Sequence, residues 1–216
     1  MKISLRLANV GLLSLAIAKL ILINTNSLLF PASSEMVYLV VTALVCVLSV
    51  VFLSLQNRAQ INYAFVLCAI AIVMLIYSQM LAPLRDSGAM LTSVWAQLFF
   101  LSRPVALGLA IAGGLGYLIQ ALSNGSSLDS HSHLLSLFAG TIYLGGEIAG
   151  SYWAFIGWGR SWSWSGHFFL SALTYLLFIS VFHIPKAWFS SASALCMAKA
   201  AVLGFISLLM LGYRLL

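Results

Sequence analysis

The chain of 216 residues is 62% hydrophobic and only 6% charged, and its mean hydropathy is +1.08. Charged residues make up about a quarter of a typical soluble domain, so this composition excludes a water-soluble protein. It predicts a polytopic integral membrane protein with the lipid bilayer as a partner. The net charge of +6 does not indicate nucleic-acid binding, because the ten Lys and Arg residues are scattered along the chain and form no basic patch.

Apolar runs, each near the twenty residues that a helix needs to cross a bilayer, recur along the whole chain. Because the backbone of such runs must bond to itself in lipid, we expect an all-α fold of about seven transmembrane helices. The first run is longer than the apolar core of a signal peptide, so we expect it to be a retained helix. In chain order, the first predicted span runs from the N-terminal residues to Phe30 and the second over about 37–55. The third runs from the link 56–62 to about Pro83, and the last four cover about 93–122, 134–156, 167–184 and 191–214.

The most polar stretch, 123–133 (SNGSSLDSHSH), is too short to be a domain. It divides a single transmembrane domain, 1–216, into three N-terminal spans (1–92) and four C-terminal spans (93–216). We expect this stretch to be a flexible loop. His131 and His133 in it are only a weak indication of a metal site, because two imidazoles without further ligands are usually just solvated.

Lys19 and Glu147 are two of the charged residues that fall inside predicted spans. Lys19 lies near the middle of the first span, where an unpaired lysine costs a few kcal/mol. We therefore expect it to face other helices. Glu147 lies in the fifth span and needs a partner if it is ionised. Lys19, Lys199 and Arg103 all remain possible partners for it.

Small residues at four-residue spacing mark one face of the fourth span. Gly108, Ala112 and Gly116 predict close contact with a neighbouring helix. Pro104, near the start of the same span, is expected to kink it.

The richest local pattern is the segment 153–164, WAFIGWGRSWSW. It holds four of the six tryptophans of the chain, with two glycines between them. Tryptophan favours the membrane–water boundary, where its ring is buried and its N–H stays hydrated. Four tryptophans in twelve residues exceed what an anchoring belt needs. The segment therefore predicts a rigid aromatic surface on an external loop between spans 5 and 6.

This segment resembles the tryptophan-rich signature of the CcsA- and CcmC-type cytochrome c biogenesis proteins, a family that handles haem. The resemblance covers about 120 residues, from about 93 onward, and Ser93–Leu98 is similar to the family segment before its first external histidine. The matching positions are Gly150, Trp153, Ala154, Trp158, Gly159, Trp162, Trp164 and, at about the family's distance, His183.

The chain also departs from the family pattern. Ser165 stands where the family has an aspartate, and Phe99 stands where its first external histidine is expected. No histidine follows His183, so the second external histidine is missing as well. Because phenylalanine has no lone pair to donate to iron, the resemblance implies the scaffold and the outward loop but not the family's haem ligation.

Several residues are therefore candidates for holding haem. Trp153, Trp158, Trp162 and Trp164 either form a docking surface for a planar group or are an interfacial belt. His167 is either a replacement iron ligand or a hydrated interfacial histidine. His183 matches the family's histidine within the membrane, and its alternative role is a hydrogen bond that ties two helices together.

Two functions of different classes follow. The first is a membrane protein that handles haem for cytochrome c assembly, with haem as its cofactor and with His167, His183 or a partner protein as the source of the iron ligand. The second is a haem-free relative that serves as a structural or assembly subunit of a larger membrane complex, in which a side chain such as Phe99 fills the former ligand space. A solute transporter is the weaker alternative, because the spans carry few polar residues.

Ordinary catalysis has no support in the sequence, which has no Ser/His/Asp set, carboxylate pair, phosphate loop or zinc spacing, so we expect no enzyme. The family resemblance implies a bacterial inner membrane or its organellar equivalent, with other membrane subunits or cytochrome assembly proteins as partners. It also implies a cytoplasmic N-terminus, which the distribution of Lys and Arg alone does not decide.

Overall fold

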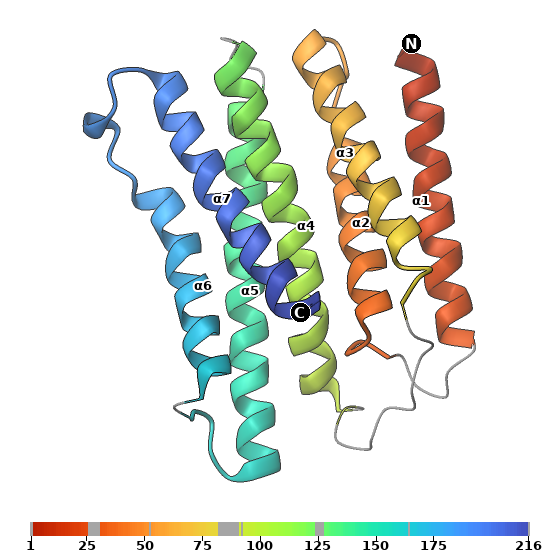
Figure 1. The fold of residues 1–216 in the computed structure, drawn as a ribbon, viewed down its shortest axis with the longest axis vertical. Coiled ribbons are helices and arrows are strands. Elements are labelled where there is room, and N and C mark those ends of the chain that lie inside the picture. Colours follow the sequence, from red (N-terminus) through yellow and green to blue (C-terminus); the bar gives the residue numbers. More distant parts are fainter. Residues whose placement is uncertain are drawn as a thin grey trace.

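The computed structural model describes residues 2–25, 31–51, 53–81, 91, 93–123, 128–163 and 165–215. Helices form the regular structure in these ranges, and they run up and down as a bundle (Figure 1). The elements are α1 (Lys2–Thr25), α2 (Glu35–Val51), α3 (Arg58–Tyr77), α4 (Val94–Ser123), α5 (Asp129–Trp158), α6 (Gly166–His183), the short 3-10 helix η2 (Lys186–Trp188) and α7 (Ala192–Leu215).

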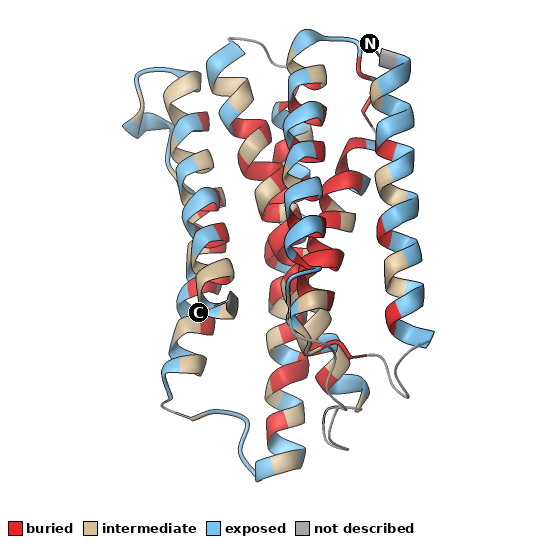
Figure 2. Ribbon diagram, turned by 45° about the vertical axis from the view of Figure 1, so that its right-hand side comes forward, coloured by how far each residue is buried: buried red, intermediate tan, exposed pale blue. Residues whose placement is uncertain are grey.

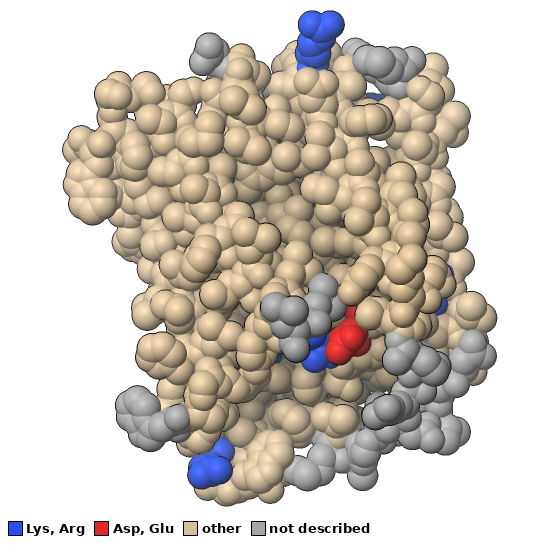
Figure 3. All heavy atoms as spheres, viewed as in Figure 1, with Lys and Arg blue, Asp and Glu red and all other residues tan. Residues whose placement is uncertain are grey.

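The length and composition of these helices confirm the predicted fold class. Six of them are long and apolar enough to cross a membrane, and α2, with 17 residues, is apolar but shorter. The chain is thus a polytopic helical membrane protein whose outer surface contacts lipid. Figure 3 agrees with this, because charged side chains cover only small, separate areas of the face that it displays.

The core lies around α4. This helix packs against α2, α3, α5 and α7, whereas α1 packs mainly on α2 and α3, and α6 on α5 and α7. Figure 2 shows the buried residues concentrated on the central helices, while α1 is largely exposed. The exposed apolar side chains of α1 are those expected of a helix that faces lipid over much of its length.

Helix α5 is longer than the predicted fifth span at both ends. It begins at Asp129, so the expected loop 123–133 is wrong in its second half, and His131 and His133 lie in the first turns of the helix. Hydropathy marks only the part of a helix that lies in lipid, and this helix continues beyond that part. The carboxylate of Asp129 in the first turn is also favourable at a helix N-terminus.

The small-residue face of α4 makes the close contacts predicted for it. A Cβ atom added to Gly108 would lie 2.7 Å from Cβ of Val45 and 2.9 Å from the carbonyl oxygen of Thr42, both on α2. One added to Gly116 would meet the Ser132 hydroxyl on α5. Glycine at these two positions therefore allows α2 and α5 to approach α4 closely.

We expect Gly108→Ala to lower the free energy of unfolding by about 1–2 kcal/mol, because the new methyl group meets atoms of α2 that cannot rotate away. Gly204 on α7 is the matched control, since a Cβ there would have nothing within 4 Å. Gly204→Ala should be neutral or slightly stabilising. Heat- or detergent-induced unfolding of both variants, followed by circular dichroism, tests the difference. Equal stabilities would mean that α2 is not held against this face.

Candidate functional site

The first half of the tryptophan-rich segment is helical rather than a loop. Trp153 and Trp158 belong to the last turns of α5, which ends at Gly159. Gly159 has a φ of 68°, a left-handed conformation that favours glycine, and its N–H donates to the carbonyl of Phe155 at 2.9 Å. The connection between α5 and α6 is therefore confined to 159–165, which includes Trp162. Trp164 lies outside the described residues.

The aromatic side chains form a hollow instead of a single flat surface. The rings of Trp153 and Trp158 lie 5.2 Å apart and nearly perpendicular, at 78°. Phe100 contacts the Trp153 ring edge-on at 5.8 Å, and Trp162 contacts Phe168 at 5.1 Å. The two edge-to-face contacts of Trp153 fix its ring relative to those of Trp158 and Phe100, whereas the pair of Trp162 and Phe168 is tilted.

A cavity of about 310 Å³ is lined by the rings of Phe100, Trp153, Trp158 and Phe168, whereas the predicted site residue Trp162 does not line it. Helices α4, α5 and α6 and the connection 159–165 all contribute to its wall. The residues that give it its chemical character are Phe99, Phe100, Trp153, Trp158, Arg160 and His167. It is an aromatic pocket whose wall also includes the imidazole of His167, the guanidinium group of Arg160 and the carboxylate of Glu147.

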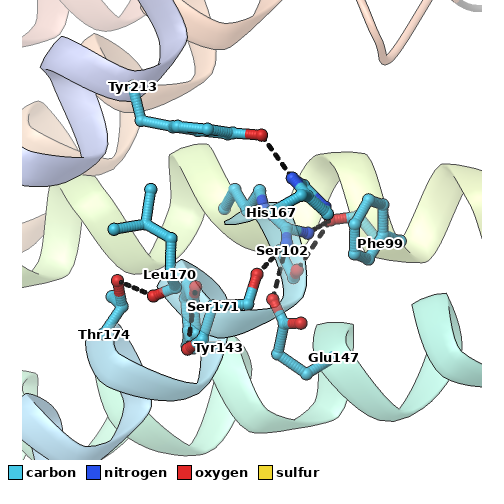
Figure 4. A network of polar contacts seen from close by, with 10 residues as sticks. Phe99, Ser102, Tyr143, Glu147, His167, Leu170, Ser171, Thr174 and Tyr213 are labelled. Carbon is cyan, nitrogen blue, oxygen red and sulfur yellow. Dashed lines mark hydrogen bonds and ion pairs between the residues drawn. The ribbon is translucent and has the colours of Figure 1, made fainter. Parts of the chain in front are cut away.

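His167 is the predicted ligand that the structure brings to the tryptophans. It lies in the first turn of α6, lines the cavity and has its ring 6.1 Å from that of Phe99. Its Nδ1 is hydrogen-bonded to the hydroxyl of Tyr213 on α7 (Figure 4). In the tautomer that donates from Nδ1, Nε2 keeps a free lone pair. An imidazole held in this way has one nitrogen fixed and the other available as a ligand.

The structure does not bring His183 to this site. His183 is the last residue of α6, sixteen residues beyond His167, which is a distance of about 24 Å along a helix. The side chain is exposed, and its Nδ1 lies 2.9 Å from the carbonyl oxygen of Ile179 in the same helix. This hydrogen bond does not tie two helices together, and one bound planar group cannot contact both His183 and Trp153.

A buried ion pair adjoins the aromatic cavity, which its carboxylate partner Glu147 also lines. Arg103 Nη2 of α4 is 2.6 Å from Glu147 Oε1 of α5, and the two side chains are only 14% and 20% exposed. The same guanidinium donates to the Ser171 hydroxyl at 3.1 Å and to the carbonyl of Phe99 at 3.2 Å (Figure 4). Tyr143 donates to the carbonyl of Ser171 at 3.5 Å. Arg103 is therefore the partner of Glu147 and joins α4, α5 and α6.

The other two candidate partners of Glu147, Lys19 and Lys199, contact other residues. Lys19 Nζ donates to the Ser78 hydroxyl of α3 at 2.5 Å, so it faces another helix as predicted. Lys199 lies over the ring of Tyr117 at 5.1 Å.

Phe99 fills the space between α4 and α5 next to this ion pair. Its ring stacks under the guanidinium of Arg103, 3.6 Å from ring centre to Cζ. The ring also lies against Gly150 of α5, where an added Cβ would be 2.1 Å from Phe99 Cδ2. Phe99 is thus buried between a cation and a helix backbone. Phe99 lines both the aromatic cavity and a smaller pocket of about 70 Å³, which also share His167.

The two histidines near the start of α5 form separate contacts. His131 lies edge-on to the ring of Tyr63 at 5.9 Å, and His133 lies edge-on to Phe182 at 5.5 Å. In the part of the chain that the structure describes, no three His, Cys, Asp or Glu side chains lie close enough to hold a metal ion together.

Ser171, Tyr143 and Tyr213 are site residues that the sequence did not single out. All three are common residue types within apolar spans, and none belongs to a recognisable motif. The available signal was the pairing of consecutive antiparallel helices, which places Tyr213 near the end of α7 beside His167 near the start of α6.

Comparison of the chain with models of protein families, with curated proteins and with solved structures found no match.

Proposed function

We propose that this membrane protein docks haem in the aromatic cavity at the end of α5 and takes part in cytochrome c assembly. The observation that carries the proposal is the position of His167, which lines the same cavity as Trp153 and Trp158. The tryptophan spacing that resembles the haem-handling family supplies the identity of the ligand. In this proposal the cavity faces the outer side of the membrane and the N-terminus is cytoplasmic.

The residues around the cavity fit a planar group. The cavity of about 310 Å³ is at the lower end of the roughly 300–1,000 Å³ of typical ligand pockets. A porphyrin would be held against the rings of Trp153 and Trp158, which line the cavity together with His167. Arg160 at the rim is suited to a carboxylate of the porphyrin. When bound, haem supplies iron for one-electron chemistry, which belongs to the cofactor.

In this proposal the residues of the chain orient the imidazole of His167 and hold the helices around the cavity in place. Tyr213 fixes the imidazole of His167, so that Nε2 points where a ligand can approach. Arg103 and Glu147 hold α4, α5 and α6 together next to the cavity. Tyr213 and the pair of Arg103 and Glu147 act by positioning other residues and do not take part in a chemical step.

The test is the absorption spectrum of the gently purified protein, oxidised and reduced, with extraction to quantify haem. We expect a Soret band in amounts stoichiometric with the chain, and its loss in His167→Ala. His183→Ala is the matched control, because it removes the same side chain at the opposite end of the same helix, and it should keep the band. A band that survives in His167→Ala and is lost in His183→Ala would overturn the site.

A second function is supported by the packing of Phe99. Its ring occupies the contact between α4 and α5 and stacks on Arg103, which is what a haem-free structural or assembly subunit predicts for the former ligand position. A protein that is purified without haem, together with other membrane subunits, would support this second function and overturn the first. The tryptophan segment would then serve as a scaffold for assembly.

A further inference from the structure

A groove runs between α1 and α3 on the opposite side of the bundle from the proposed haem site. It consists of two adjoining hollows of about 460 and 750 Å³, which share Leu12, Leu15 and Ile72 in their walls. We call it the α1–α3 groove. Small side chains keep it open, above all Gly11, where an added Cβ would have nothing within 4 Å.

The two ends of the groove differ in polarity. The hollow nearer the C-terminal end of α1 contains Lys19 and Gln79, and the shared wall beyond it is apolar. The far hollow is lined mostly by apolar residues and by the uncharged polar residues Ser4 and Asn62. Lys19 is six residues from the end of α1 at Thr25, about 9 Å along the helix. Its flexible side chain can therefore bring the ammonium group to the membrane boundary while its carbon chain stays among apolar residues.

Lys19 has a neutral partner in this position. Its ammonium group donates to the Ser78 hydroxyl, and across the described ranges of the chain the only ion pair is that of Arg103 with Glu147. An ammonium group has three donors, so two remain for a ligand. An anionic oxygen at the groove end would compensate a charge that otherwise lies at the edge of the lipid.

We infer that the α1–α3 groove binds an anionic phospholipid. The phosphate pairs with Lys19, and one acyl chain lies along Leu12, Leu15 and Ile72. The order of a charged end followed by a long apolar channel matches the order of headgroup and acyl chain, and basic pockets between membrane helices bind anionic headgroups for this reason. A transmembrane helix in the groove would cover the apolar wall but would leave Lys19 without a counter-charge.

The test compares retained lipids by native mass spectrometry after reconstitution into nanodiscs of phosphatidylcholine with phosphatidylglycerol. We expect wild-type protein to retain phosphatidylglycerol preferentially and Lys19→Met to reduce that preference about five-fold. Lys19→Arg should preserve it. Arg58→Met is the matched control, because Arg58 is an exposed cation outside the groove, and it should leave the preference unchanged.

A second variant distinguishes a lipid bound in the groove from a protein partner bound there. A Cβ at Gly11 has nothing within 4 Å, so the side chain of Gly11→Leu extends into the groove and should reduce retention of both lipids while circular dichroism stays unchanged. An unchanged phosphatidylglycerol preference in Lys19→Met would overturn the inference. So would a wild-type dimer that Gly11→Leu dissociates while Lys19→Met does not, since the groove would then hold a second copy of this chain. None of these outcomes depends on haem binding.

Discussion

Replacing Glu147 with leucine is expected to lower the free energy of unfolding by about 3 kcal/mol, because the guanidinium of Arg103 then remains buried without its carboxylate. Arg103 cannot release its proton to escape this cost. Its hydrogen bonds to Ser171 and to the carbonyl of Phe99 remain, so the loss should fall at the lower end of the roughly 3–5 kcal/mol found for broken buried pairs.

The double variant Arg103→Met/Glu147→Leu provides the decisive comparison. Removing both charges together should recover most of the lost stability, since buried pairs can often be replaced by apolar groups at little cost. Arg160→Met removes an exposed guanidinium and should change stability by less than about 0.5 kcal/mol. Unfolding in mild detergent titrated with dodecyl sulfate, followed by circular dichroism, measures all four proteins. A double variant as unstable as Glu147→Leu would show that the pair does not act as a unit.

The partner of Glu147 can be predicted from the sequence only when it is known which helices are neighbours. Composition and run length were enough to predict the helices, because apolar runs of this length in lipid have no other structure. Those runs do not say which side chains face each other. Among Lys19, Lys199 and Arg103, charge alone gave no reason to choose.

The geometry of a helical hairpin predicts which residues of α4 and α5 face each other. Two consecutive helices with a short link are antiparallel neighbours, so residues equally far from the link lie side by side. The contacting pairs between them all obey this rule: Phe99 with Gly150, Ser102 with Gly146, Arg103 with Glu147, Gly113 with Ser136, and Gly116 with Ser132. The register of one hairpin therefore predicts the ion pair, the small-residue contacts and the position of Phe99 together.

The pairing rule for consecutive helices does not apply to contacts between helices that are not consecutive in the chain. Arg103 with Ser171 joins α4 to α6, and Gly108 with Val45 joins α4 to α2. Helices that are not consecutive have no fixed register, because it depends on how the whole bundle packs. The sequence predicted the tryptophan surface and His167 as candidates. The contact of His167 with Tyr213 joins the consecutive helices α6 and α7, but the link between them is longer and contains η2, so their register is fixed less closely than that of α4 and α5.

Gly150→Ala is expected to lower the free energy of unfolding by about 2–3 kcal/mol, at the upper end of the usual cost of overpacking. The added Cβ would lie 2.1 Å from Cδ2 and 2.4 Å from Cε2 of Phe99. That ring cannot simply rotate away, because it is stacked under Arg103 on one side and lies 6.0 Å from the ring of Trp153 on another. Moving it therefore disturbs both the ion pair and the wall of the aromatic cavity.

Gly145, five residues earlier on the same helix, is the matched control because a Cβ there would have nothing within 4 Å. Gly145→Ala should stabilise the protein by up to about 1 kcal/mol through helix propensity alone. Combining Gly150→Ala with Phe99→Leu should recover much of the loss, since the shorter side chain vacates the space that the new methyl group needs. Equal effects of the two glycine substitutions in the same detergent titration would mean that Phe99 does not hold α4 against α5. The Phe99 ring would then no longer be an argument for the haem-free subunit.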